Sequence, residues 1–86
     1  MNKKEFRLVG FLTELVKRYG YTIERYSYRD LENEMKSVTY ATIRNYMVDL
    51  ERLGYLTIER KGSCKQAFIL NKDKVKSVFN EARIQH

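Results

Sequence analysis

The sequence predicts an α+β domain, mainly helical, with a three-helix core, a two-stranded β-hairpin and an additional C-terminal helix. Three observations indicate this class. Apolar residues recur at helical spacing near the N-terminus, across residues 40–53 and again after residue 72. Two short β-prone runs flank a turn that contains Gly62. Three of the helical stretches are preceded by residues of the types that favour helix N-caps, namely Ser27, Thr39 and Asn71.

The first predicted helix covers residues 3–19 and ends at Gly20. Its apolar residues span an arc of roughly 160° on a helical wheel, wider than one core contact needs, and Phe6 lies outside that arc. The helix either packs only across its own domain or also contacts a second subunit. The arc contains Leu8, Val9, Phe11, Leu12, Leu15, Val16 and Tyr19.

Residues 21–26 are too short for a second long helix and mix β-branched and aromatic residues with charges. Ser27 and Asp30 then have the spacing of a capping box, which predicts a short helix over residues 28–35. Lys36, Ser37 and Val38 follow as a turn. The two helices on either side of this turn are therefore joined by a few residues only.

The next predicted helix covers residues 40–53, with Thr39 as its N-cap and Gly54 as the residue that ends it. One stripe, within an arc of roughly 120°, predicts a side that faces the core. It consists of Ile43, Tyr46, Met47, Leu50 and Leu53. The opposite side carries Ala41, Arg44, Asn45, Val48 and Arg52.

Residues 55–70 predict a β-hairpin, because a run with Leu56 and Ile58 on one face is followed by a turn and a second β-prone run. Its tip is basic, with Arg60, Lys61 and Lys65 against Glu59. A final helix is predicted over residues 72–83 after the cap Asn71. It packs against the first helix of the same subunit, of a partner, or both. Candidate dimer contacts on the two helices are Leu8, Phe11, Leu15, Val75, Val78, Phe79 and Ala82.

The composition limits the range of possible functions and partners. The 86 residues suit one domain, and 17 Lys plus Arg against 11 Asp plus Glu give a net charge of +6 and a pI near 9.6. This balance favours a polyanionic partner. No apolar run reaches the roughly 18 residues that span a bilayer, and no secretory signal is evident, so we expect no membrane association and an intracellular, cytoplasmic location.

Catalytic and metal chemistry have little support. Cys64 is the only cysteine and His86 the only histidine, so a cysteine-cluster metal site and a paired nucleophile and base are not expected. We therefore predict that the protein is not an enzyme and carries no metal or cofactor. A domain this small also offers little room for an effector pocket, and no small-molecule effector is expected.

The segment DLERLGYL, which closes the helix over residues 40–53 and enters the hairpin, resembles the end of the second helix-turn-helix helix in winged helix-turn-helix transcription regulators. The matching apolar and glycine positions are Ile43, Leu50, Leu53, Gly54, Tyr55 and Leu56. The resemblance implies that residues 28–35 form the positioning helix, residues 40–53 the recognition helix and residues 55–70 the wing. It also implies that residues 21–26 pair with the wing as a minimal strand. A small basic regulator of this kind suits an archaeon, a plasmid or a virus.

The resemblance implies double-stranded DNA as the partner. Recognition-helix side chains near its N-terminus would enter the major groove, where Arg44 suits guanine, Asn45 suits adenine, and Ala41 or Val48 can touch a thymine methyl. Phosphate contacts are expected from Tyr40 and Thr42 in the first turn, from Arg29 at the positioning helix, and from Arg60, Lys61 and Lys65 of the wing. The protein is expected to act as a homodimer that regulates transcription.

An alternative of a different class stays open. Arg44 and Arg52 are matched in charge by Asp49 and Glu51, so the recognition helix is neutral overall. A neutral helix face also suits a winged-helix module that binds another protein in a larger assembly. The basic wing favours DNA over this alternative.

Overall fold

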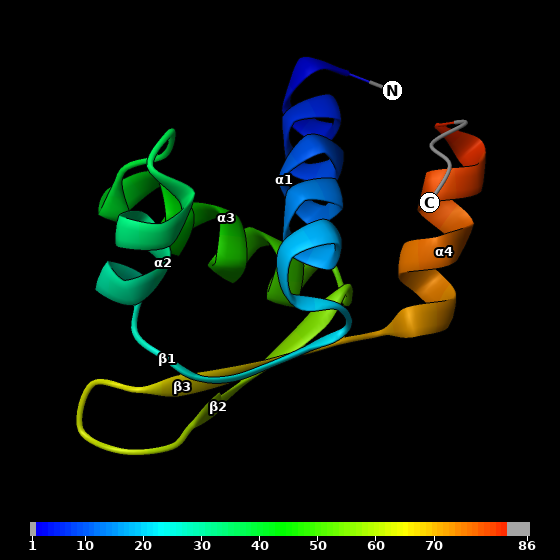
Figure 1. Cartoon of the computed structure of the whole chain (residues 1–86). Helices are drawn as coiled ribbons and strands as arrows, with labels where there is room; N and C mark the ends of the chain where they lie inside the picture. The colour runs from blue at the N-terminus through cyan, green and yellow to red at the C-terminus, as the bar shows by residue number, and fades with distance from the viewer. Residues whose placement is uncertain (1, 83–86) are drawn as a thin grey trace.

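A computed structural model of the chain describes residues 2–82. In this range the chain forms four helices and one three-stranded antiparallel sheet, a mainly helical α+β structure (Figure 1). The elements follow one another as α1 (Lys3–Tyr19), β1 (Thr22–Tyr26), α2 (Tyr28–Met35), α3 (Tyr40–Arg52), β2 (Leu56–Arg60), β3 (Gln66–Leu70) and α4 (Lys72–Glu81).

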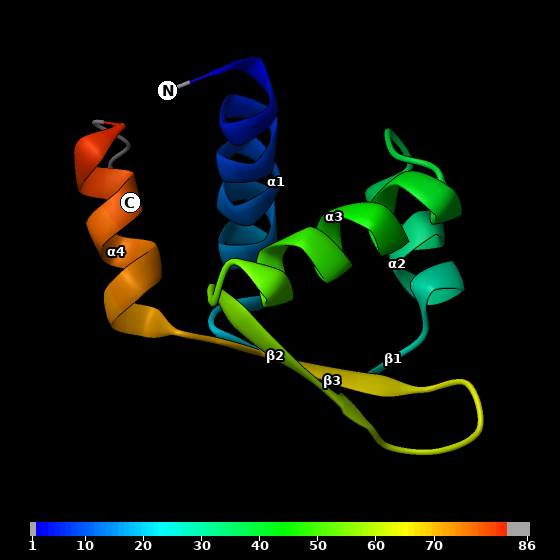
Figure 2. The same cartoon turned by 180° about the vertical axis from the view of Figure 1, so that it is seen from behind.

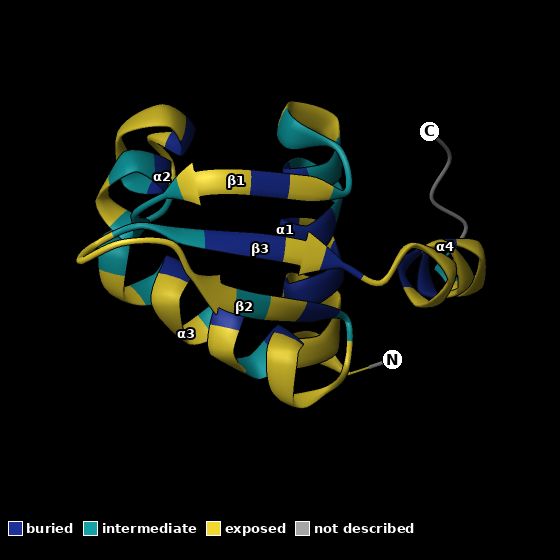
Figure 3. Cartoon of the chain, turned by 90° about the horizontal axis from the view of Figure 1, so that it is seen from below, coloured by how far each residue is buried: buried dark blue, intermediate teal, exposed yellow. Residues whose placement is uncertain are grey.

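The sheet has the strand order β1-β3-β2. The hairpin β2–β3 pairs in continuous register from Leu56 opposite Leu70 to Arg60 opposite Gln66. On the other side of β3, β1 pairs at Thr22 and Ile23 and then shifts register before Tyr26. The predicted two-stranded hairpin is therefore part of a three-stranded sheet, with the run at residues 21–26 supplying the added strand. Figure 3 shows the strands side by side with α1, α2 and α3 behind them.

Side chains of the residues just before the helices cap their N-termini. At α2, the Ser27 hydroxyl accepts a hydrogen bond from the Asp30 backbone N–H at 3.0 Å, and the Asp30 carboxylate accepts one from the Ser27 N–H at 2.9 Å. This is the predicted capping box. At α4, the Asn71 side chain accepts from the Lys74 N–H at 3.2 Å. Each cap satisfies backbone donors that have no partner inside the helix.

The core lies between the helices and one face of the sheet. Leu12 of α1, Leu31 of α2, Met47 of α3 and Phe68 of β3 are all fully buried there. Burying side chains of this size stabilises the fold by roughly 1.5–3 kcal/mol each before the entropy of ordering is subtracted. One shared core thus fixes α3 relative to α2 and to the hairpin, and this relation positions the candidate site.

Helix α4 packs on the side of α1 that faces away from α2 (Figures 1 and 2). Val75, Val78 and Phe79 are buried against the core, and Lys74 donates to the Leu53 carbonyl at the end of α3. A cation at a helix C-terminus is favourable because carbonyl oxygens there lack partners. The wide apolar arc of α1 is therefore covered within the same chain, by α4 together with α3 and the rest of the core.

The predicted dimer contacts take part in this packing within the single chain. Most of the candidate side chains are buried inside their own chain, so they belong to the core and do not form a free surface for a second subunit. Only Ala82 is half-buried, and it packs against the same core. The buried candidates are Leu8, Phe11, Leu15, Val75, Val78 and Phe79.

The ends of two helices also differ from the prediction. Leu53, placed by periodicity on the core stripe of α3, is the C-cap residue and is 38% exposed, because the chain leaves the helical path there. Gly54 follows with φ 86°, a conformation that glycine adopts readily. Helix α4 ends at Glu81, and residue 83 of its predicted range lies outside the described residues.

None of the described helices is long and apolar enough to cross a membrane.

Candidate nucleic-acid interface

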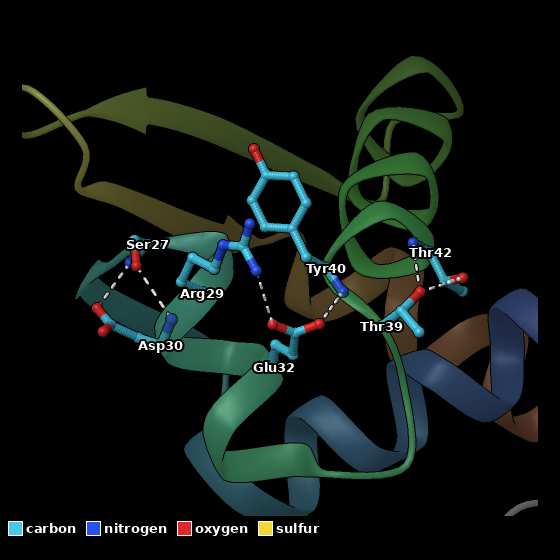
Figure 4. A network of polar contacts seen from close by, with 7 residues as sticks. All are labelled: Ser27, Arg29, Asp30, Glu32, Thr39, Tyr40 and Thr42. Atoms are coloured by element: carbon cyan, nitrogen blue, oxygen red, sulfur yellow. Dashed lines mark hydrogen bonds and ion pairs between the residues drawn. The ribbon is translucent and has the colours of Figure 1, made fainter.

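A hydrogen bond connects the N-terminus of α3 to α2 (Figure 4). Thr39 caps α3 by accepting from the Thr42 N–H at 3.3 Å, and Glu32 of α2 accepts from the Tyr40 N–H at 2.7 Å. A carboxylate at this position interacts favourably with the helix dipole. Because Glu32 already occupies the first turn, the α3 amides are a poor anion site, and side chains must supply any attraction for phosphate.

One side of α3 is open to solvent. In Figure 2 this helix lies in front of α1, with the hairpin extending below it. The predicted base-reading residues Ala41, Arg44, Asn45 and Val48 are all exposed, and Val48 is 46% exposed although it is apolar. Ile43, Met47 and Leu50 on the opposite side are fully buried. Except at Leu53, helical periodicity therefore predicted correctly which side of α3 is buried and which is exposed.

The two arginines of α3 have different surroundings. Arg52 lies 3.3 Å from Asp49, whose carboxylate also lies 3.6 Å from Lys4 of α1. Within residues 2–82 neither a hydrogen bond nor an ion pair engages the guanidinium of Arg44. A guanidinium with no carboxylate partner keeps its donors available for a ligand. Arg44 is thus the available cation on the exposed side of α3.

Arg29 and Tyr40 come together where α2 and α3 meet. The guanidinium of Arg29 lies over the Tyr40 ring, 4.6 Å from its centroid, and 3.3 Å from a Glu32 oxygen. Figure 4 shows these three side chains together, with Tyr40 beside the guanidinium. Stacking on the ring orients the guanidinium, and the nearby carboxylate neutralises part of its charge.

An open groove of about 450 Å³ joins α2, α3 and the hairpin. The structure thereby brings the predicted residues Arg29, Tyr40 and Arg44 to one place. It adds side chains that the sequence analysis did not assign to the site, because their proximity depends on the tertiary fold. The whole lining is Ser27, Tyr28, Arg29, Tyr40, Arg44, Ser63, Cys64 and Gln66.

Two of the added residues contribute polar groups. Burial raises the pKa of Tyr28, although the positive charge of Arg44 opposes the rise, so its hydroxyl stays protonated at neutral pH. Gln66 has a buried Oε1 atom that accepts no hydrogen bond within the described chain. A buried acceptor without a donor is unfavourable, which favours a polar occupant of the groove.

The basic residues of the hairpin divide into three environments. Lys61 lies 3.3 Å from Glu59 on the same hairpin, and Arg60 is exposed with no ion pair inside residues 2–82. Lys65 is half-buried and forms an ion pair with Asp30 of the capping box. Lys65 therefore ties the hairpin to the start of α2.

The same contact changes the acidity of Asp30. The hydrogen bond from Lys65 and that from the Ser27 backbone hold the pKa of the Asp30 carboxyl below its ordinary value. The carboxylate form is therefore stabilised in the folded protein. The same carboxylate takes part in both the helix cap and the contact to the hairpin.

Thr42 is not part of the groove. Its hydroxyl is engaged with the Thr39 hydroxyl at 3.0 Å, and its side chain is half-buried. Ala41, Asn45 and Val48 are exposed on α3 but do not line the groove either. Of the predicted residues, Arg29, Tyr40 and Arg44 therefore line the groove, next to a separate exposed strip of α3.

Comparison of the chain with protein-family models, with curated proteins and with solved structures finds no match.

Proposed function

We propose that this chain is a winged helix-turn-helix protein that binds double-stranded DNA, with α3 in the major groove and the hairpin β2–β3 as the wing. The observation that carries the proposal is the environment of Arg44. Among the described residues it is exposed on α3 without a carboxylate partner, and it lines one groove with Arg29 and Tyr40 beside the basic hairpin. Arginine in this setting suits bidentate hydrogen bonding to the O6 and N7 atoms of guanine.

The order of elements supports the same proposal. Helices α2 and α3 are joined by residues 36–39 only, and a hairpin follows α3 directly. In helix-turn-helix docking the second helix enters the major groove while the first crosses the DNA backbone. Arg29 at the start of α2 then faces phosphate, and Arg60 and Lys61 of the hairpin reach the backbone or the adjacent minor groove.

The rival function, a winged helix that binds another protein, loses part of its support. It rested on the acidic side chains of α3. In the structure Asp49 is paired with Arg52 and Lys4, and Glu51 accepts from the Ile58 N–H at 2.8 Å. These carboxylates hold α3 to α1 and to β2, so they contribute less charge to the exposed side than the sequence suggests.

A titration with duplex fragments, including the promoter of the protein's own gene, tests the proposal at low and moderate salt. Wild type is expected to retard particular fragments, and Arg44→Ala is expected to lose that preference. The matched control is Arg52→Ala, which removes the same side chain from the same helix at a position already paired with Asp49. Absence of duplex binding at low salt by wild type would refute the proposal.

A regulatory homodimer is part of the proposed function. Two copies would place their α3 helices in successive major grooves, about 34–36 Å apart, on a pseudo-palindromic site. Such a site doubles the number of phosphate contacts and makes binding more sensitive to salt.

A further inference from the structure

Phe6 is the most exposed large apolar side chain of the described chain, at 68% exposure. It lies on the side of α1 that faces neither the core nor α4. The remaining residues of that side are polar or small. An aromatic side chain in such a setting indicates a contact that the single chain does not make.

Gly10 is one helical turn further along the same side of α1. It is exposed in the middle of a helix, and a Cβ atom built there would meet nothing within 4 Å. Glycine in a helix interior is less favourable than alanine by roughly 0.5–1 kcal/mol. Packing inside the chain gives no reason for this glycine, but close approach of another helix does.

We propose that α1 pairs with α1 of a second copy in an antiparallel, two-fold arrangement, with Phe6 of each copy over Gly10 of the other. Residues 6 and 10 are four positions apart, a separation of about 6 Å along the helix axis. A two-fold axis near residue 8 brings each Phe6 level with the opposite Gly10. Because each helix then contributes both the aromatic ring and the space, the contact closes as a dimer and does not extend into a fibre.

Two charges on the same side of α1, those of Lys3 and Glu14, fit a second copy in this arrangement. In the antiparallel arrangement Lys3 of each copy lies near Glu14 of the other, so two opposite-charge pairs flank the central contact. Glu14 already lies 2.8 Å from Arg18 of its own chain, and its exposed side chain can accept a second cation. A parallel pairing would instead place Lys3 near Lys3 and Glu14 near Glu14.

This dimer surface shares no residue with the groove lined by Arg29, Tyr40 and Arg44. Both surfaces can therefore be used at once. The contact between the two α1 helices rests on the proposed binding of DNA by two copies. Because self-association is measured without DNA, either proposal can fail without the other.

Sedimentation equilibrium over a wide range of protein concentration tests the contact. Wild type is expected to approach twice the 10.4 kDa of one chain. Phe6→Ala and Gly10→Gln are each expected to raise the dissociation constant by about tenfold or more, as removal of a central interface contact does. Ile69→Ala is the matched control, because Ile69 is an exposed apolar residue of the sheet. Circular dichroism checks that each variant is folded.

Charge reversal tests the orientation. Lys3→Glu and Glu14→Lys are each expected to weaken association, and the chain carrying both substitutions is expected to recover it. A monomeric wild type at every concentration would overturn the proposal, as would an unchanged mass in Phe6→Ala and Gly10→Gln. Failure of the double variant to recover association would overturn the antiparallel arrangement. Association with a different protein in place of self-association would likewise count against it.

Discussion

Arg44 and Arg52 lie on the same exposed side of α3 and carry the same charge, but their surroundings separate their roles. Asp49 neutralises Arg52, and Lys4 of α1 shares that carboxylate. Arg44 has no such partner in the described chain and lines the groove beside Arg29 and Tyr40. The proposed function therefore depends on which side-chain charges have no ion-pair partner within the described chain.

Arg44→Ala is predicted to cost about 1–3 kcal/mol in binding to the preferred duplex and to reduce discrimination between bases at one position. The reason is the loss of a bidentate contact in the major groove. Titration of the variant against the preferred duplex and single-base variants of it measures both effects. Arg52→Ala is expected to change affinity much less. An equal loss in the two variants would indicate general electrostatic attraction and no base reading by Arg44.

At the level of whole elements, one ion pair links the hairpin to α2. Lys65 of the hairpin and Asp30 of α2 are 35 positions apart in the sequence and form one ion pair in the fold. Asp30 also completes the capping box with Ser27. A single carboxylate thus supports a helix start and the position of the hairpin.

Stability at acid pH is predicted to depend on Asp30. Its pKa is lowered in the folded state, so its contribution is fully present above the unfolded pKa and is lost as the pH falls through the folded pKa. Asp30→Asn removes the titrating group but keeps an oxygen that can accept from the Ser27 N–H. Urea unfolding at a series of pH values should therefore show a shallower decrease in stability at acid pH for Asp30→Asn than for wild type. Equal slopes would contradict this account.

DNA binding distinguishes two roles of Lys65. If Lys65 mainly positions the hairpin, Asp30→Asn and Lys65→Ala should both weaken binding, because each breaks the same ion pair. If Lys65 mainly holds phosphate, Asp30→Asn should maintain or raise affinity, since the ammonium is released. We predict the first result, because the Lys65 side chain is half-buried against α2. A measured rise in affinity for Asp30→Asn would contradict it.

Helix α1 provides a further prediction. Gly10→Ala should stabilise the isolated chain by roughly 0.5–1 kcal/mol, because alanine favours the helix and its Cβ has free space. Denaturant unfolding in the Phe6→Ala background, where the proposed dimer is weakened, measures this effect in the single chain. A destabilised variant would show that Gly10 has an unrecognised role within the chain.

The sequence predicted the helices well because their signals are local. Ser27, Thr39 and Asn71 cap the helices that follow them, and Gly54 has the positive φ expected after α3. The burial of Leu53 was wrong, since periodicity cannot show where the chain leaves a helix. Nor could the sequence show that most of the candidate dimer residues are buried in their own chain, since an apolar arc on α1 does not reveal whether α4 or another chain covers it.

The candidate site was only partly predictable. Arg29, Tyr40 and Arg44 were assigned from helix positions, and the structure brings them to one groove. Tyr28 and Gln66 were not assigned, because their proximity requires the hairpin to fold back toward α2. The pairing of Lys65 with Asp30 depends on the same long-range contact. In the sequence, Phe6 differs from the other apolar residues of α1 only in lying outside their arc, and this position alone does not show how exposed its side chain is.

The whole molecule combines a net charge of +6 with one groove that contains two arginines. Such a protein should bind DNA with a strong dependence on salt, because phosphate contacts release counterions. Lys61→Ala is predicted to weaken binding to all duplexes alike and to reduce the slope of log affinity against log salt by about 1 per copy. Titrations at several salt concentrations measure the slope. An unchanged slope would place Lys61 outside the interface.

The most direct measurement of the central proposal is protection of guanine N7 from methylation, because N7 lies in the major groove. We predict that wild type protects guanines in two clusters about one helical turn apart, and that Arg44→Ala loses protection at one guanine in each cluster while Arg52→Ala retains it. Binding without any protection of N7, or a pattern that Arg44→Ala leaves unchanged, would contradict α3 as the element that reads the DNA.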